Sequence, residues 1–311
     1  MPKATRHSPA RTDLKVNAMP VSRRNFLHAS SLALLPALWP NSTLLQAAEP
    51  APASTRKMKL GLVTYQWGKD WDVPTLIKNC TAANFSGVEL RTSHKHGVEI
   101  SLTPTQRADV RKQFADSSVA VVGIGSACEY HAVDQAVVKK NIEETKQFIL
   151  LSEAIGGTGV KVRPNGLPAS VPVEQTVAQI GRALHEVAEF GQEHGQEIRL
   201  EVHGPGTMEL PVLHQIIQAA NHKNAVVCWN CNKSDMNGAG LEANFKLVQD
   251  KIRTVHIHDL TKDNYPWPEL FALLKGISFD GWTLMEENHI PKDIVAAMKE
   301  NRAVWEKLTA E

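Results

Sequence analysis

The chain has 311 residues, and its 34 Lys and Arg against 33 Asp and Glu give a formal charge of +1 at pH 7. So balanced a charge does not attract nucleic acid or an anionic membrane over long range, and we expect a small-molecule ligand instead. Hydrophobic residues at 42% and charged residues at 22% are ordinary globular values, which excludes a disordered chain, a collagen-like fibre or a coiled coil. Four cysteines are too few for the disulfide framework of a small secreted scaffold.

The N-terminal region resembles a twin-arginine export signal. Ser-Arg-Arg-Asn-Phe-Leu at residues 22–27 precedes an apolar run at residues 29–38, and the small residues Ala47 and Ala48 follow. The apolar run is interrupted by proline and is shorter than the roughly 20 residues that a membrane span needs, so we expect no stable membrane anchor. We expect export by the twin-arginine pathway to the periplasm or another extracytoplasmic space.

This signal divides the chain into three parts. We predict a signal peptide over residues 1–48, a linker over 49–57 and the folded domain over 58–311, with translation starting at Met1 or at Met19. Cleavage after residue 48 leaves a chain close to the length of one α/β barrel, about 250 residues.

From residue 58 onward, short β-rich runs alternate with amphipathic helical stretches, which is typical of βα units around a parallel sheet. The predicted strands cover residues 59–65, 87–91, 119–126, 159–163, 197–203, 225–230, 252–258 and 282–286. The predicted helices cover residues 73–83, 105–117, 134–155, 173–194, 210–220, 241–250, 268–276 and 294–308. Asp134 is placed for an N-cap, and Gly156 for the end of the same helix. Eight strand–helix pairs predict a single-domain (β/α)₈ TIM barrel rather than an open sheet.

Polar residues gather at the C-terminal ends of the predicted strands, where TIM barrels hold their active sites. Alternate residues of a strand point to the same face, so several of these side chains are expected to converge on one mouth. The inward residues are Glu89, Arg91, Lys161, Arg163, Glu201, His203, Asn230, His256, His258 and Glu286. They can form a buried polar layer without chemistry, but burying this many charges costs several kcal/mol per ion without a metal or ligand.

From residue 58 to the C-terminus, the chain resembles the sugar phosphate isomerase/epimerase family of xylose isomerase-like TIM barrels. The resemblance rests on a glutamate on strand five, a polar residue on strand six, His-x-His-Asp on strand seven and Gly-Trp-x-x-x-Glu on strand eight. It implies that Glu201, Asn230, His256 and Glu286 are the four ligands of a divalent metal ion.

Two positions depart from the family pattern. Asn230 stands where Asp is usual, and its neutral carbonyl oxygen binds a hard cation less tightly than a carboxylate does. His258 stands where the family usually has Lys. Lys161 and Arg163 can offset the missing carboxylate, or else His203 or Asn232 can complete the coordination shell.

The resemblance implies a metal-dependent isomerase or epimerase that acts on a keto-sugar or related polyol derivative through proton abstraction and an enediolate. Glu201 and Glu286 are expected to be the acid–base pair as well as metal ligands. The expected substrate contacts are Lys161, Arg163, His203, His258, Glu89 and Trp67. One histidine, two carboxylates and an amide favour Mn²⁺, with Mg²⁺, Co²⁺ or Zn²⁺ as alternatives. The expected partner is a carbohydrate substrate, with a homo-oligomer left open.

Two other functions use the same residues. A lyase or dehydratase acting on a 3-keto-glycoside or keto-polyol also begins by removing a proton beside a ketone. An exported sugar-binding barrel that has lost its metal is the alternative from a different class, and activity after stripping and restoring metal separates this binder from both enzymes.

Overall fold

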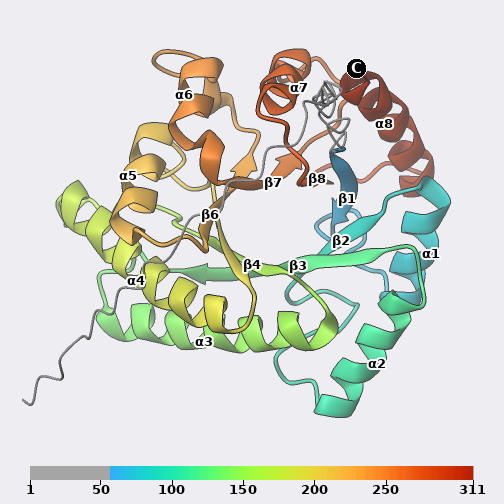
Figure 1. The fold of residues 1–311 in the computed structure, drawn as a ribbon, viewed down its shortest axis with the longest axis horizontal. Coiled ribbons are helices and arrows are strands. Elements are labelled where there is room, and N and C mark those ends of the chain that lie inside the picture. The colour runs from blue at the N-terminus through green and yellow to red at the C-terminus, as the bar shows by residue number, and fades with distance from the viewer. Residues whose placement is uncertain (1–56, 311) are drawn as a thin grey trace, which may run out of the picture. The chain divides into compact units, whose positions relative to one another are not determined.

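A computed structural model describes residues 57–310 of the chain, and the signal peptide and nearly all of the linker that the sequence predicts lie outside these residues. Within the described part, eight parallel strands follow one another in chain order around a closed barrel, and β8 pairs with β1. The strands are β1 Lys59–Val63, β2 Gly87–Arg91, β3 Ala120–Glu129, β4 Gly159–Arg163, β5 Glu197–Glu201, β6 Ala225–Asn230, β7 Ile252–Ile257 and β8 Trp282–Met285. The (β/α)₈ TIM barrel predicted from the sequence is confirmed (Figure 1).

The helices alternate with the strands and surround the barrel (Figure 1). They are α1 Val73–Ala83, α2 Pro104–Ala115, α3 Gln135–Ile155, α4 Val173–Glu193, α5 Leu210–Ala220, α6 Leu241–Val248, α7 Trp267–Gly276 and α8 Ile294–Thr309. Asp134 caps α3 as expected, since its side chain accepts a hydrogen bond from the backbone N–H of Ala136, and Gly156 ends the helix with φ 87°. No helix in the described part of the chain is both long and apolar enough to cross a membrane.

Three strand ends differ from the prediction by two or more residues, and β7 and β8 each end one residue early. Strands β1 and β5 each end two residues earlier than expected, at Val63 and Glu201, whereas β3 continues to Glu129 across a register shift. The alternating pattern continues into the loops after β1 and β5, so the sequence does not mark where ladder pairing stops. His203 therefore belongs to a loop rather than to a strand.

Apolar side chains pack on both sides of the strands. The larger cluster joins residues of the strands to residues of the surrounding helices. A smaller cluster contains Val63, Val122 and Leu284, with Tyr65 and Trp282 packed against it. Because β1 and β3 are not neighbours, this second cluster lies inside the barrel, where it supports the polar side chains above it.

Arg199 on β5 occupies the barrel interior near the N-terminal ends of the strands. It is 3% exposed, and it donates hydrogen bonds to the Val122 carbonyl (2.9 Å), Thr158 Oγ1 (2.8 Å) and Glu197 Oε2 (3.1 Å). A Cβ atom at Gly159 would lie 2.8 Å from the guanidinium carbon, so only glycine leaves room for this arrangement.

The loop after β6 is held by a buried carboxyl group. Asp235 Oδ2 accepts hydrogen bonds from the Tyr265 hydroxyl (2.7 Å) and the backbone N–H of Asn232 (3.0 Å). The Asn232 side chain in turn donates to the carbonyl of Asn230 (2.7 Å). Burial raises the pKa of Asp235 to about 7, against hydrogen bonds that lower it. The residue that ends β6 is thus connected to a group that titrates near neutral pH.

We expect Arg199→Leu to lower the free energy of unfolding by about 2 kcal/mol or more, because it leaves the buried Val122 carbonyl without its donor and removes the buried one of the two cations beside Glu197. Urea denaturation measures this change. Arg253→Leu is the matched control, because Arg253 also contacts Glu197 (3.5 Å) but its side chain is 44% exposed. We expect the control to cost about 1 kcal/mol or less. Equal losses in the two variants would contradict the role given to Arg199.

Asp235 gives the folded protein a defined pH dependence. Its carboxyl has a higher pKa in the folded protein (about 7) than in the unfolded chain, where an aspartate titrates near 3.8, so it contributes stability at low pH that is lost as the pH rises from about 4 to 7. The Asp235→Asn variant lacks this titration. We expect the free energy of unfolding of wild type, relative to that of this variant, to fall between pH 5 and pH 7 by at most about 1.4 kcal/mol per pH unit. Thermal unfolding of both proteins across this range measures the difference, and parallel curves would contradict the assignment.

Candidate functional site

A cavity of about 220 Å³ lies at the C-terminal ends of the strands, the end predicted for the site. Seven residues expected at the site line it: Lys161, Arg163, Glu201, His203, Asn230, His258 and Glu286. The wall is mainly polar and charged. The cavity is below the roughly 300–1,000 Å³ typical of drug-sized ligands, so its volume suits a small polar molecule.

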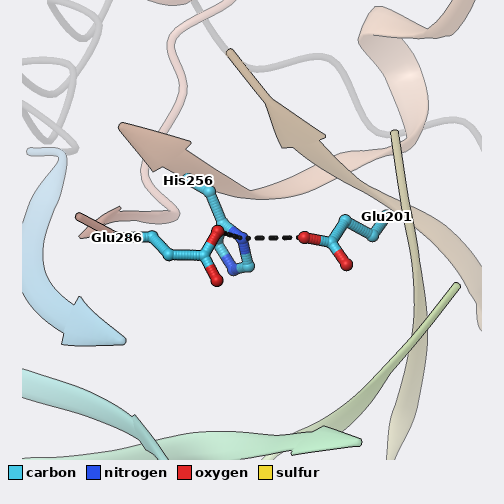
Figure 2. A group of neighbouring side chains, drawn as sticks. All are labelled: Glu201, His256 and Glu286. Atoms are coloured by element: carbon cyan, nitrogen blue, oxygen red, sulfur yellow. Dashed lines mark ion pairs between the residues drawn. The ribbon is translucent and has the colours of Figure 1, made fainter. Parts of the chain in front are cut away.

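Glu201, His256 and Glu286 meet at the base of this cavity. Figure 2 shows the two carboxylates on either side of the His256 imidazole, each directing an oxygen toward it. The Nδ1 atom of His256 lies 3.4 Å from Glu201 Oε1 and 3.1 Å from Glu286 Oε2. One ligand atom from each of the three residues lies within 4.8 Å of the others. Three donors therefore converge on one point.

In each carboxylate, one oxygen contacts a cation and the other faces Nδ1 of His256. Glu201 Oε2 accepts a hydrogen bond from Lys161 Nζ (2.8 Å), which leaves Oε1 facing His256. Glu286 Oε1 lies 3.6 Å from an Arg91 guanidinium nitrogen, which leaves Oε2 facing His256. Arg91 itself stacks 4.2 Å from the centre of the Tyr65 ring. The flanking cations thus orient both carboxylates toward Nδ1.

Asn230 offers a fourth donor atom, its amide oxygen. Its Nδ2 atom lies 3.4 Å from Glu201 Oε1, while its buried Oδ1 atom has no hydrogen-bond partner among residues 57–310. An unpartnered buried oxygen needs a cation or a water molecule, since otherwise its desolvation is uncompensated. Ligands about 2.1 Å from an octahedral or tetrahedral metal lie about 3.0–3.4 Å apart, which the measured Nδ1–oxygen distances match. These residues fit a divalent metal ion.

The charged groups of this cluster shift one another's pKa values. Burial lowers the pKa of Lys161, but the carboxylates of Glu201, Glu89 and Glu286 outweigh that effect and raise it. Burial likewise raises the pKa of Glu201, yet Lys161 and His256 bring it well below its usual range. The ammonium and the carboxylate are therefore both charged at neutral pH.

The pKa values of His256 and Glu286 are also shifted by opposite charges that outweigh the effect of burial. Burial lowers the pKa of His256, but the Cys228 sulfur and the carboxylates of Glu286 and Glu89 raise it well above its usual value. For Glu286, burial raises the pKa and the His256 charge lowers it below the usual value. The raised pKa makes the His256 imidazole more basic, so a proton competes with a metal ion for Nδ1.

The rim of the cavity is ordered by side-chain hydrogen bonds. Arg163 pairs with Glu129 at the end of β3, and Asn165 Nδ2 also donates to Glu129 (2.7 Å). The Oδ1 atom of the same Asn165 lies 2.7 Å from Nδ1 of His203. Burial lowers the pKa of His203, so its ring is neutral at neutral pH. His258 Nδ1 lies 2.7 Å from the Glu286 carbonyl, which fixes the second ring.

Two residues expected to contact substrate lie elsewhere among the described residues. Trp67 is buried and donates its indole N–H to the His289 carbonyl (2.7 Å), so it connects the loops after β1 and β8. Glu89 lies behind His256, with Oε1 3.3 Å from Nε2. Neither is among the described residues that line the cavity.

Sequence reasoning expected Arg91 at the mouth without giving it a role, and it did not identify three further lining residues, Tyr65, Met208 and Asn288. Arg91 follows Glu89 by two residues, so both side chains point to the same face of the strand, and this spacing was sufficient to place Arg91 at the mouth. Tyr65 and Asn288 lie in loops just beyond β1 and β8, where strand periodicity no longer predicts the direction of a side chain.

The fold and the site can now be compared with known proteins. The family model described as "Xylose isomerase-like TIM barrel" matches residues 77–308. The search of curated proteins found no significant match.

Solved structures share the fold at low sequence identity. The structure of L-ribulose 3-epimerase is 18% identical, covers 81% of this chain and 94% of its own, and has a TM-score of 0.70. The apo form of 3-keto-D-glucoside 4-epimerase from E. coli is 12% identical, with 81% and 99% covered and a TM-score of 0.68. The IOLI protein with a bound zinc atom is 15% identical, with 81% and 98% covered and a TM-score of 0.69. Because the family model spans most of the described barrel, the chain belongs to the xylose isomerase-like TIM barrel family.

Proposed function

We propose that this protein is a metal-dependent isomerase or epimerase that acts on a keto-sugar or a related polyol derivative. The observation that carries the proposal is the convergence of Glu201, Glu286 and His256 Nδ1 at the base of a small polar cavity. Metal ligands and proton-transfer groups then lie within reach of the same substrate carbon.

Glu201, Asn230, His256 and Glu286 would hold the metal ion, and Mn²⁺ best suits a set with one nitrogen and several oxygen donors. When bound, the ion polarises the substrate carbonyl and fixes the neighbouring hydroxyl oxygen. The unpartnered Asn230 oxygen supports its place in this set.

We expect the two carboxylates to transfer protons from different sides of a bound substrate. Glu201 extends from β5 and Glu286 from the end of β8, and both face the same point from different directions (Figure 2). Their lowered pKa values keep both ionised before substrate binds, so either can accept the proton next to the carbonyl. Inversion of the carbon requires the other carboxylate to take up a proton from solvent or from a substrate hydroxyl group and deliver it to the opposite face, while the first carboxyl group releases the proton that it accepted. Return of the proton by the same group to the adjacent carbon isomerises the sugar.

The cations of the wall stabilise the negative charge that follows proton removal. Lys161 is charged and only 2% exposed, so its ammonium acts in a site of low effective dielectric constant. The neutral ring of His203 and the ring of His258 can donate to substrate hydroxyl groups, and Arg163 lies farther out on the rim. These residues would orient the substrate and stabilise an enediolate.

The named structural neighbours agree with this reaction class. They include L-ribulose 3-epimerase, D-psicose 3-epimerase and 3-keto-D-glucoside 4-epimerase, and also a probable 3-DHS dehydratase. The dehydratase matters because a lyase begins with the same proton abstraction as an epimerase. Product analysis in the experiment below therefore separates these two outcomes.

Export by the twin-arginine pathway is part of the proposal. The Arg23-Arg24 pair and the apolar run after it support this route, which carries folded proteins and so allows metal to be loaded before export. Fractionation of cells that produce the full chain, compared with a variant in which both arginines are lysine, tests the localisation.

We expect the purified protein, stripped with chelator and reloaded with Mn²⁺, to exchange a carbon-bound proton of its substrate with solvent in D₂O. A panel of ketoses and 3-keto-glycosides, followed by NMR and mass spectrometry, identifies the carbon and the product. A product that has the same elemental composition as the substrate, with an inverted stereocentre or a moved carbonyl group, supports isomerisation. Loss of water or of an aglycone makes the protein a lyase. Sugar binding without any exchange, with or without metal, would reject the enzyme in favour of a binding protein.

Glu201→Gln and Glu286→Gln are each expected to lower turnover by roughly 10²-fold or more, because the amide cannot accept a proton. Bound metal is measured together with the rates, since both side chains are also proposed ligands. Glu197→Gln is the control, because it removes a carboxylate at the opposite end of the barrel. Full turnover in both site variants would contradict the acid–base assignment.

A further inference from the structure

Glu89 on β2 is an unusual buried acid. It is 1% exposed, and neither of its carboxylate oxygens has a hydrogen-bond partner in the described part of the chain. A buried charge without partners is expensive, and such groups are paired or serve a function. The ionisable group beside it is His256, whose Nε2 atom lies 3.3 Å from Glu89 Oε1.

The two nitrogens of His256 face different partners. Nδ1 faces Glu201 and Glu286, whereas Nε2 faces Glu89. A histidine that binds a metal through one nitrogen carries its proton on the other, and a hydrogen bond from that N–H fixes both the tautomer and the orientation of the ring. Because the imidazole lies between Glu89 and the other two carboxylates, Glu89 cannot share their ligand position.

We propose that Glu89 is a positioning residue, which accepts the Nε2–H of His256 and so holds Nδ1 toward the metal. The inference rests on the proposed metal site and adds a residue to it that does not touch metal or substrate. The observed 3.3 Å separation is just beyond the usual N–H···O range of about 2.7–3.2 Å. The role differs from the substrate contact expected from the sequence.

The neighbouring strand supplies independent support. Gly125 on β3 leaves a space that the Glu89 carboxylate occupies, and a Cβ atom there would lie 2.9 Å from Glu89 Oε1. The next nearest atom, Arg91 Cα, would be at an ordinary 3.4 Å. Alanine at residue 125 would therefore displace the end of the Glu89 side chain, which can move, rather than the backbone. Gly125→Ala thus shifts this carboxylate without changing any charge.

Mn²⁺ binding measured by the EPR signal of the free ion tests the proposal without reference to activity. The proteins compared are wild type, Glu89→Leu, Glu89→Gln, Gly125→Ala and the control Glu197→Gln. We expect Glu89→Leu to weaken Mn²⁺ binding about 10- to 100-fold, the usual effect of losing a partner of a metal-bound histidine. Glu89→Gln should stay within about fivefold of wild type, because its amide oxygen can still accept the Nε2–H. Gly125→Ala should weaken binding, and the control should leave it unchanged.

Each outcome either supports or overturns the positioning role of Glu89. Binding by Glu89→Leu and Gly125→Ala within about twofold of wild type would overturn the positioning role while leaving the proposed metal site intact. Equal losses in Glu89→Gln and Glu89→Leu with normal Gly125→Ala would show that only the charge matters, and would also overturn it. If wild type binds no Mn²⁺, the proposed metal site fails and this role fails with it. Should Glu89→Leu not fold, the Gly125→Ala and Glu89→Gln proteins still test the geometry.

Discussion

Three carboxylates are buried in the mouth of the barrel, and nearby cations compensate their charge. Glu89, Glu201 and Glu286 are each less than a tenth exposed, and an unpaired buried ion costs several kcal/mol. The protein supplies Lys161 beside Glu201, Arg91 beside Glu286 and a protonated His256 between all three. The cluster is thus a set of anions arranged around one replaceable positive charge, the proton on His256. Exchange of this proton for the divalent ion proposed above would raise the net charge of the cluster from zero to +1, so the buried carboxylates stay compensated.

The barrel makes room for large interior groups by placing glycine on nearby strands. Gly125 on β3 admits the Glu89 carboxylate from the adjacent β2, and Gly159 on β4 admits the Arg199 guanidinium from the adjacent β5. A Cβ atom at Gly87 on β2 would lie 2.4 Å from the ring of Trp282, which comes from β8, two strands away. Each large side chain therefore lies against a position that has no side chain at the point of contact. Glycine thus leaves space both for Arg199 and for the acid beside His256.

Strand periodicity predicts much of this fold and part of the site, for identifiable reasons. The period of two directed Lys161, Glu201, Asn230 and Glu286 to one mouth, and the structure places all four on one cavity. Parity alone does not give depth along the barrel axis, which is why Glu89 was expected at the substrate and lies instead behind His256. Trp67 was assigned from loop position, but its N–H has a backbone partner that depends on a loop more than 200 residues away in the sequence. Glycine within a strand is the sequence signal for close approach, and β3 carries two, Gly123 and Gly125.

Asn230 can be understood from the charge of its neighbours. With a divalent ion bound as proposed, Glu89, Glu201 and Glu286 contribute three negative charges, and Lys161, Arg91 and the ion contribute four positive ones. An aspartate in place of Asn230 would add a fourth anion and lower the net charge of this group from +1 to zero. A less anionic environment makes a metal ion a stronger electrophile toward a carbonyl oxygen, although it binds the ion less tightly. A neutral oxygen at residue 230 would therefore complete the proposed coordination while keeping the ion acidic enough to assist removal of a carbon-bound proton.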